Sequence, residues 1–498
     1  MSSKFQIFKL PLLTVLLVAV LLRLPLLNGS FWLDEAAQAL ESARPFSQQL
    51  LIRGDFQPPL LHYLIHFALY ISDSEWWLRT VGALIPGIVT VFFTYQLGLL
   101  LGNKKTALMA ALLLATSSFH IFYSQELRQY SLPALFAIAS WYMLIKAWKS
   151  DKELSISKLL LFTLLQAAGL YSSYLFPFSQ LGQIAWLLYI HPKHVGRWLA
   201  GFFGSALLFL PWVPYFLDQL SAGTELRSAL PGWETVVSPT QLRALPLVIS
   251  KFVYGIADVE VNLLYVAISI AIAASLGVVL FSKKFTRAEF TALSPVIFWL
   301  VIPIIFSWLI SFYVPVLQPK RVLFCLPAFY LLVSMVALNL RSRLKQPVLS
   351  FLTPLMLMVL LSINIFTVTQ YWTKPVLQRE NWKQMVSDIE ADYPESSVAV
   401  FSFTEAFSPW RWYASDTFPT LPTYEIFLTE ETAIATVKQA TRYDFVITFD
   451  YLADLTDPNR MLHKQLVAYG YKEIEVIDYP VIGFVRIYSK PEAVISYR

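Results

Sequence analysis

The stretch LPLLTVLLVAVLL, residues 10–22, decides the class of this fold. It follows Lys4 and Lys9, and it opens a chain of 498 residues that is 56% hydrophobic and only 14% charged. Soluble domains carry about 25% charged residues, so this composition excludes a soluble globule. A basic start before an apolar run is typical of a signal peptide. Because no small-residue cleavage site follows, we expect a retained anchor helix.

Further apolar segments follow along the chain. A membrane-spanning helix needs roughly 20 mostly apolar residues. We therefore expect an α-helical polytopic membrane protein with about 11 transmembrane helices. They lie near residues 8–27, 79–101, 106–123, 131–148, 158–177, 178–191, 198–217, 261–281, 291–313, 322–340 and 347–371.

The charges of the loops orient these spans. With the N-terminus inside, the inner connections carry 16 basic residues and three acids. The outer segments before residue 372 carry 10 basic residues and 12 acids. Because cytoplasmic loops are enriched in Lys and Arg, we expect a multi-pass cell-membrane protein with a cytoplasmic N-terminus.

The chain divides into two expected domains. Residues 1–372 form the transmembrane domain, with long outer loops at 28–78 and 218–260. Residues 373–498 carry 12 basic and 18 acidic residues and no spanning segment. Strand-like runs alternate with a helical pattern there, so we expect a small α/β extracytoplasmic domain. Its expected elements are a helix at 381–391, strands at 397–403 and 444–449, and a hairpin at 473–489.

An acidic pair, Asp34-Glu35, lies in the first outer loop, close to the first span. Carboxylates this near to lipid are costly unless they are solvated or paired, so they are candidates for function. The pair could bind a cation, start a proton path or supply a general base. Alternatively, Asp34 caps the helix that follows it. Position alone leaves both interpretations open.

Three further outer motifs carry charge or potential ligands. Arg128, in the turn at 123–130, suits an anionic phosphate because its guanidinium is a planar fork, although a headgroup anchor has the same position. Lys320-Arg321 place two adjacent cations outside, where a phosphate or a loop acid would offset them. His62 and His66 share one helical face near Asp55, a spacing that can hold a metal but that also arises by chance.

The single cysteine, Cys325, excludes an intrachain disulfide and a cysteine-based metal site. It lies in an apolar run, where we expect it to be a small buried hydrophobic residue.

The motifs and their order resemble those of the bacterial family 39 glycosyltransferases. These are relatives of the protein O-mannosyltransferases and the lipid A aminoarabinose transferases in the GT-C superfamily. The resemblance is strongest over residues 20–150. The motifs that carry it are Leu33-Asp34-Glu35-Ala36, Pro58-Pro59-Leu60, Ser124-Gln125-Glu126-Leu127-Arg128-Gln129-Tyr130 and the segment that begins at Gln318-Pro319-Lys320-Arg321.

The resemblance implies a GT-C glycosyltransferase that takes a sugar from a polyprenyl phosphate and passes it, with inversion, to a hydroxyl of a lipid, protein or glycan. Asp34 matches the catalytic acid of the first loop and would take the hydroxyl proton or orient the hydroxyl, with Glu35 as its helper or as a helix cap. The leaving phosphate would be held by Arg128, Lys320 and Arg321. The expected substrate contacts are Gln57, Glu126 and Tyr130.

One departure from the family concerns the residues before Pro58-Pro59. The aminoarabinose transferases have an acid, a metal ligand, and a lysine there, and many family 39 members have His before the prolines. This chain has Phe56 and Gln57. The departure speaks against the aminoarabinose substrate and that metal site. No cofactor is assigned, a divalent cation stays an option, and no nucleic-acid partner is expected.

The alternative from another class is a transporter or flippase of a lipid-linked or anionic solute. Such a protein needs ionisable residues inside the bilayer and helices broken near its midplane. Here the charges cluster at the ends of spans, mainly outside, which favours chemistry at the surface.

Overall fold

The computed structural model describes residues 2–150, 155–192, 195–230, 241–258, 260–280, 287–338, 347–393 and 396–491. Internal contacts divide the chain into two compact units. The helical unit consists of Met1–Leu27, Phe46–Leu217 and Val237–Thr373. The sheet unit consists of Asn28–Pro45, Asp218–Val236 and Lys374–Arg498. The segment with Asp34 and Glu35 thus groups with the C-terminal residues.

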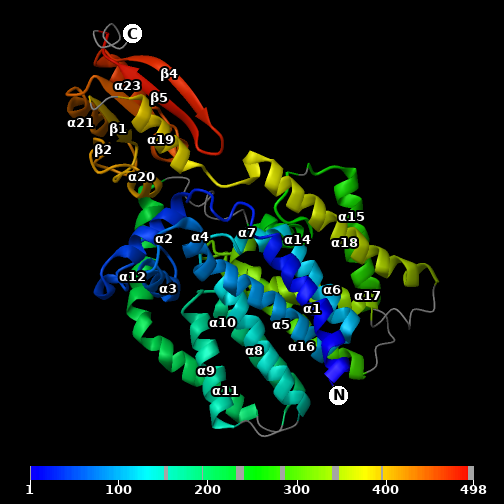
Figure 1. The fold of residues 1–498 in the computed structure, drawn as a ribbon. Helices are drawn as coiled ribbons and strands as arrows, with labels where there is room; N and C mark the ends of the chain where they lie inside the picture. The colour runs from blue at the N-terminus through cyan, green and yellow to red at the C-terminus, as the bar shows by residue number, and fades with distance from the viewer. Residues whose placement is uncertain are drawn as a thin grey trace. The chain divides into compact units, whose positions relative to one another are not determined.

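The helical unit has an apolar helix at each expected span (Figure 1). These helices are α1 (Ser2–Leu21), α5 (Ile85–Leu101), α6 (Lys104–Thr116), α7 (Ser118–Tyr123), α8 (Ser131–Ser150), α9 (Ile156–Leu170), α10 (Phe176–Ile190), α11 (Val195–Phe209), α15 (Leu263–Leu280), α16 (Arg287–Ile310), α17 (Leu326–Leu338) and α18 (Pro347–Thr373). The shorter α3 (Leu60–Leu69) and α4 (Glu75–Arg79) come before α5.

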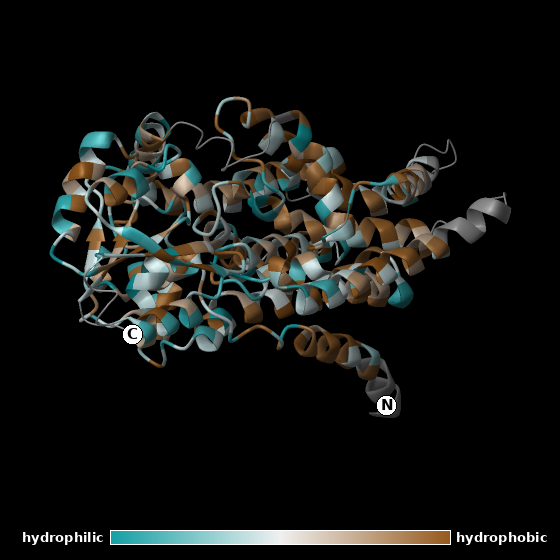
Figure 2. Cartoon of the chain, turned by 90° about the horizontal axis from the view of Figure 1, so that it is seen from above, coloured by the Kyte–Doolittle hydropathy of each residue, from teal (hydrophilic) through white to brown (hydrophobic). Residues whose placement is uncertain are grey.

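Six helices among the described residues are long and apolar enough to cross a membrane. They include Glu75–Leu101, in which α4, a π-helical turn (Thr80–Leu84) and α5 run on without a break. The expected count of about eleven spans is not confirmed. One reason is that the span expected at 106–123 is broken at Ser117, which has an extended backbone conformation between α6 and α7. In Figure 2 the helix that follows the N-terminal label is brown, hydrophobic, over several turns.

Close helix packing builds the core of the helical unit. Helix α17 is almost entirely buried and packs against α6, α16 and α18. Helices α5 and α6 approach closely at Gly98, where a Cβ atom would come within 2.6 Å of the Cα of Ala107. Small residues allow such an approach in apolar bundles. Cys325 is buried, as expected.

The loop expected at 218–260 is largely helical where it is described. Helix α12 (Val213–Ala229) extends into it, and α14 (Gln241–Tyr254) precedes its end. Pro231, Gly232 and Pro239, three of the six Pro and Gly residues of this segment, lie at 231–240, outside the described residues.

The sheet unit contains a five-stranded sheet in the order β2-β1-β3-β5-β4. Strand β1 pairs in parallel with β2 and β3, whereas β5 is antiparallel to both β3 and β4. The strands are β1 (Ser397–Phe401), β2 (Thr420–Pro422), β3 (Phe445–Phe449), β4 (Lys472–Tyr479) and β5 (Gly483–Ser489). The expected α/β domain, with both strands and the hairpin, is confirmed. Strand β2 was not expected.

Helices cover both faces of this sheet. Side chains alternate across a strand, so Phe401 packs with Trp382 and Trp410, whereas Val400 packs with Val437 on the other face. The first face is covered by α19 (Trp382–Asp392) and α20 (Ser408–Tyr413), and the second by α21 (Glu430–Ala440) and α23 (Met461–Ala468). Helix α2 (Leu33–Ala43) packs against α20.

Candidate functional site

Helix α2 carries the acidic pair that the sequence singles out. Its N-cap is Trp32, whose side chain makes no capping hydrogen bond. Asp34 and Glu35 lie in the first turn, where carboxylates interact favourably with the helix dipole. The alternative that Asp34 is the N-cap is therefore wrong, because the helix already begins at Leu33.

The residues before α2 are bound into the sheet unit. The N–H of Phe31 donates to the hydroxyl of Tyr413 at 2.7 Å. The hydroxyl of Ser30 accepts from the N–H of Lys383 at 3.0 Å. Leu33 packs at the margin of the cluster around Trp382. These contacts fix the start of α2, and with it Asp34, relative to α19 and α20.

Glu35 is fully buried and forms an ion pair with Arg379. Their closest atoms, Oε2 of Glu35 and Nε of Arg379, are 3.7 Å apart, and only 7% of the arginine side chain is exposed. A buried charge is costly unless it is paired. Arg379 therefore explains how a carboxylate can be buried at this place.

Glu380 adds a second carboxylate to the surroundings of Asp34. It accepts hydrogen bonds from the indole of Trp382 at 2.6 Å and from the hydroxyl of Tyr451 at 2.9 Å. Burial raises the pKa of Glu380 to about 7; the hydrogen bonds from Trp382 and Tyr451 lower it, and the charge of Asp34 raises it further.

Asp55 is the centre of a polar cluster in the helical unit. One of its carboxylate oxygens accepts from Arg128 at 2.8 Å, and the other lies 2.7 Å from Nε2 of His62 and accepts from the amide of Gln57. Only 8% of the Asp55 side chain is exposed. Burial alone would raise the pKa of Asp55, but the charges and hydrogen bonds of Arg128 and His62 outweigh burial and lower it.

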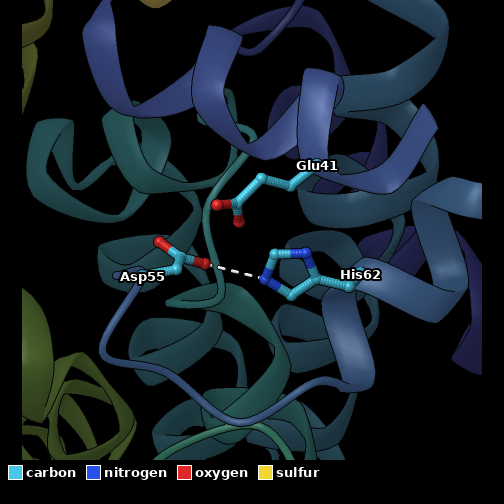
Figure 3. A group of neighbouring side chains, drawn as sticks. All are labelled: Glu41, Asp55 and His62. Atoms are coloured by element: carbon cyan, nitrogen blue, oxygen red, sulfur yellow. Dashed lines mark hydrogen bonds and ion pairs between the residues drawn. The ribbon is translucent and has the colours of Figure 1, made fainter. Parts of the chain in front are cut away.

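Figure 3 shows the carboxylate of Asp55 pointing at the ring of His62. Glu41, the third side chain drawn there, belongs to the sheet unit. The ring nitrogens of His66 have other neighbours, the amide of Gln49 at 3.4 Å and the hydroxyl of Tyr70 at 3.3 Å. Carboxylate and imidazole are ligand types that suit Zn²⁺. Asp55 and His62 thus offer two donors for a divalent cation.

The turn that carries Glu126 and Arg128 is anchored by Gln125. Its buried amide donates to the carbonyl of Arg23 at 2.7 Å and to that of Pro25 at 2.5 Å, and it accepts from the hydroxyl of Tyr371 at 3.2 Å. Glu126 is buried next to it, and its carbonyl accepts from the N–H of Arg128 at 2.7 Å. The turn is thereby held against residues at the end of α1 and in α18.

The two cations of the 318–321 link lie in different surroundings. The ammonium of Lys320 is 5.5 Å from the ring centre of Tyr130, within the range of a cation–π interaction. Tyr130 is buried and packs edge-on against Tyr123. The guanidinium of Arg321 donates to the carbonyls of Pro315 and Val316 at 3.4 and 3.3 Å.

The structure brings several expected site residues together. Arg128 and Gln57 share Asp55, and Lys320 meets Tyr130. Sequence reasoning considered Asp55 only as a metal ligand and missed Arg379 and Glu380. The one local signal for these two was a pair of opposite charges just after the last span.

Comparison with known proteins connects the fold to a superfamily. Residues 56–215 match the family model described as dolichyl-phosphate-mannose-protein mannosyltransferase. A search of curated proteins gives no match.

Solved structures are similar over nearly the whole chain. One is the oligosaccharyltransferase AglB from Archaeoglobus fulgidus, in complex with an inhibitory peptide and a dolichol-phosphate, with a TM-score of 0.54, 13% identity, and coverage of 98% of this chain and 74% of that chain. AglB is also known in complex with Zn and sulfate, with a TM-score of 0.51, 13% identity, and coverage of 96% and 72%. Another is ArnT from Cupriavidus metallidurans bound to undecaprenyl phosphate, with a TM-score of 0.55, 10% identity, and coverage of 98% of both chains.

These findings confirm the resemblance to the GT-C superfamily of membrane glycosyltransferases. At such low identity, the likeness to solved structures establishes that the chain has the GT-C fold. The segment matched by the family model contains Gln57, His62 and Arg128, three of the four members of the polar cluster around Asp55.

Proposed function

We propose that this chain is a glycosyltransferase that moves a sugar from a polyprenyl-phosphate-linked donor to a hydroxyl acceptor at the outer face of the cell membrane. The observation that carries the proposal is the buried Arg128 in the segment that matches the mannosyltransferase model. AglB with a dolichol-phosphate and ArnT with undecaprenyl phosphate have the same fold, which supports a lipid phosphate as the donor group.

In the proposed reaction, the acceptor oxygen attacks the anomeric carbon of the donor. The bond from that carbon to the phosphate oxygen breaks, and its electron pair leaves with the lipid phosphate. Asp34 takes the proton of the acceptor hydroxyl. A base within hydrogen-bond reach of the attacking oxygen contributes about 10²–10⁴ in rate. Since attack comes from the side opposite to the phosphate, the anomeric configuration inverts.

The leaving phosphate gains charge that cations can stabilise. Arg128, Lys320 and Arg321 are the proposed partners, because hydrogen bonds between charged groups are about twice as strong as neutral ones. Arg128 already pairs with Asp55, so its guanidinium is held in one orientation before the donor arrives. Gln57, Glu126 and Tyr130 are the proposed contacts to the rest of the substrate.

The proposal leaves room for a divalent cation bound near the donor phosphate. Asp55 and His62 would hold it, and it would add positive charge for the phosphate. Their types fit Zn²⁺, and AglB has been seen with Zn and sulfate. Metal analysis of the purified protein with and without the substitution H62A tests this option, because loss of bound metal in the variant is expected if His62 is a ligand.

The experiment for the function uses the protein reconstituted into lipid vesicles with a panel of polyprenyl-phosphate sugars. Mass spectrometry follows the formation of polyprenyl phosphate and of a glycosylated acceptor. We expect the wild type to transfer a sugar and D34N to fold but to transfer none. If D34N matches the wild type, Asp34 is not the base. If a labelled donor crosses the membrane and no glycosidic bond forms, the chain is a flippase instead.

A further inference from the structure

The sheet unit contains a cavity of about 220 Å³ at the carboxyl ends of β1 and β3. Ser402, the residue after β1, and Thr448 and Phe449, the last two residues of β3, form part of its wall. Arg486 of β5, which pairs with Thr448, and residues at the start of α23 form another part. The proposed transfer reaction uses none of these residues.

The order of the strands explains why a cavity lies at this place. Strands β1 and β3 are parallel neighbours, but the chain leaves β1 toward α20 on one face of the sheet and leaves β3 toward α23 on the other. In open α/β sheets, ligands bind outside the carboxyl ends of two such strands, where the connections diverge. The topology therefore marks this end of the sheet as a place for a ligand.

We propose that this cavity binds one neutral sugar unit. Pockets for drug-sized ligands measure about 300–1,000 Å³, so a cavity of about 220 Å³ suits a smaller ligand, of about the size of a monosaccharide. The inference goes beyond the proposed function, because none of the residues proposed for catalysis or for donor binding lines this cavity.

The charges around the cavity are compensated within the protein. Arg486 donates to both carboxylate oxygens of Asp450, at 2.9 and 3.1 Å. Arg460 pairs with Asp454 at 2.7 Å. Asp457 accepts from the first two N–H groups of α23, at 2.7 and 3.0 Å. An anion in the cavity would meet carboxylates and a cation would meet guanidiniums, so the lining favours a ligand that is polar but neutral.

Donors and acceptors lie side by side in the lining, which suits the hydroxyls of a sugar. A hydroxyl both donates and accepts, so it can bridge a guanidinium and a carboxylate. Nη1 of Arg460 and Oδ1 of Asp450 are 4.0 Å apart, too far for a direct hydrogen bond. This Nη1 is buried and makes no hydrogen bond within the part of the chain that the structure describes. Since 41% of the Arg460 side chain is exposed, its guanidinium can turn toward a sugar hydroxyl that donates to Asp450.

The backbone beside the cavity gives independent support. Arg460 and Leu452 have positive φ angles, 53° and 58°. Leu452 directly precedes Ala453, which is another residue of the wall. The left-handed conformation is costly for residues other than glycine, and residues held in it cluster at ligand-binding sites. Arg460, which carries the buried donor, is thus held in a conformation that is typical of a binding site.

The test is a binding measurement on the full-length protein in detergent. Saturation-transfer NMR detects weak binding, and the probes are methyl glycosides of neutral hexoses, pentoses and N-acetylhexosamines. We expect at least one glycoside to bind saturably to the wild type and equally well to D34N, because Asp34 does not line the cavity. The inference is wrong if no glycoside binds saturably. It is also wrong if binding is lost in D34N, because the sugar then occupies the proposed reaction site.

Two variants of the lining locate the bound sugar. Glycine adopts a positive φ readily, so R460G removes the guanidinium and keeps the backbone. We expect about tenfold weaker binding, because hydrogen bonds to charged groups are lost. H463A removes a second, exposed side chain of the wall and should also weaken binding. It decides the question if R460G fails to fold. Wild-type affinity in the folded variants overturns the inference.

R411A is the control, and inorganic phosphate is the second probe. Arg411 lies on α20 and pairs with Glu405 away from the cavity, so R411A should bind the glycoside like the wild type. If phosphate binds, is weakened by R460G and is not displaced by any glycoside, the cavity is an anion site and the assignment to a neutral sugar is wrong. None of these binding results bears on the proposed function, which depends on sugar transfer by the wild type and its loss in D34N.

Discussion

The guanidinium of Arg379 lies 3.7 Å from the carboxylate of Glu35, and both side chains are buried in the sheet unit. Glu35 comes from the first loop of the chain and Arg379 from the segment after the last helix of the helical unit. Helix α2, which carries the candidate base Asp34, is therefore joined to the rest of the sheet unit by packing contacts and by an ion pair. Removal of either partner should affect that unit as a whole.

The first prediction concerns R379A. This substitution leaves Glu35 buried without its cation, and breaking a buried pair in this way costs about 3–5 kcal/mol. We expect a lower unfolding temperature and lower transfer, because the first turn of α2 loses a partner. The double variant E35Q/R379A should be more stable than R379A alone, because it has no unpaired charge. Thermal unfolding in detergent measures all three proteins.

R411A is the matched control for this prediction. Arg411 pairs with Glu405 in the same unit, but 47% and 66% of the two side chains are exposed. Exposed pairs contribute about 0–1 kcal/mol, so R411A should unfold near the wild-type temperature. If R379A and R411A lower the unfolding temperature equally, burial does not increase the contribution of the Glu35–Arg379 pair to stability.

The second prediction concerns acid and Asp55. The pKa of this carboxyl is lowered in the folded protein, so it contributes stability above its unfolded pKa of about 3.9. That contribution disappears as the pH falls through the lower folded pKa. The wild type should therefore exceed D55N in unfolding temperature near neutral pH, and the difference should shrink in acid. Unfolding curves of both proteins at several pH values measure it.

A difference that stays constant into acid would mean that the pKa of Asp55 is the same in the folded and the unfolded protein, contrary to its pairing with Arg128 and His62. The comparison with D55N matters because other carboxyls titrate in the same range. They change both proteins alike and cancel in the difference.

Local patterns in the sequence predicted the helices and strands that depend on residues close together in the chain. The helix at 382–392 and the β4–β5 hairpin follow from their own periodicity, and both formed where expected. Strand β2 has three mostly exposed residues, so it has no apolar alternation by which to be found. It is a strand only because β1 offers it an edge.

The sequence identified individual residues of the candidate site, but it did not predict which of them pair with one another. Asp55 and Arg128 were each singled out, yet 73 positions separate them and nothing local joins a carboxylate to a guanidinium. The ion-pair partner of Glu35 is more distant still, since Arg379 follows the last apolar helix. Such contacts come from the tertiary fold, and they decide which candidate acids are buried, paired or raised in pKa.

The third prediction concerns Gln125, the anchor of the turn that carries Arg128. Q125A removes the donor that serves the carbonyls of Arg23 and Pro25 and leaves the hydroxyl of Tyr371 without its acceptor. Buried polar groups without partners cost about 1–3 kcal/mol each. We expect a lower unfolding temperature and a higher KM for the donor, because the turn that carries Arg128 is released.

Y371F separates the two parts of this anchor. It removes only the hydroxyl that donates to Gln125 and leaves both carbonyl contacts in place. Y371F should lower the unfolding temperature less than Q125A does, and it should raise the KM for the donor less. Similar losses in the two variants would show that Tyr371, and not the carbonyl contacts, holds the turn.

The fourth prediction separates two roles of Tyr130. Its ring lies 5.5 Å from the ammonium of Lys320, whereas a substrate contact would use its hydroxyl. Y130F keeps the ring and Y130A removes it. A cation–π interaction at a partly desolvated site contributes about 0.5–2 kcal/mol. If the ring places Lys320 for the donor phosphate, Y130F should keep the wild-type KM and Y130A should raise it. The double variant K320A/Y130A should then be no worse than K320A, because the two residues act through one contact. Initial rates against donor concentration measure all four variants, and a raised KM in Y130F would instead assign the hydroxyl to the substrate.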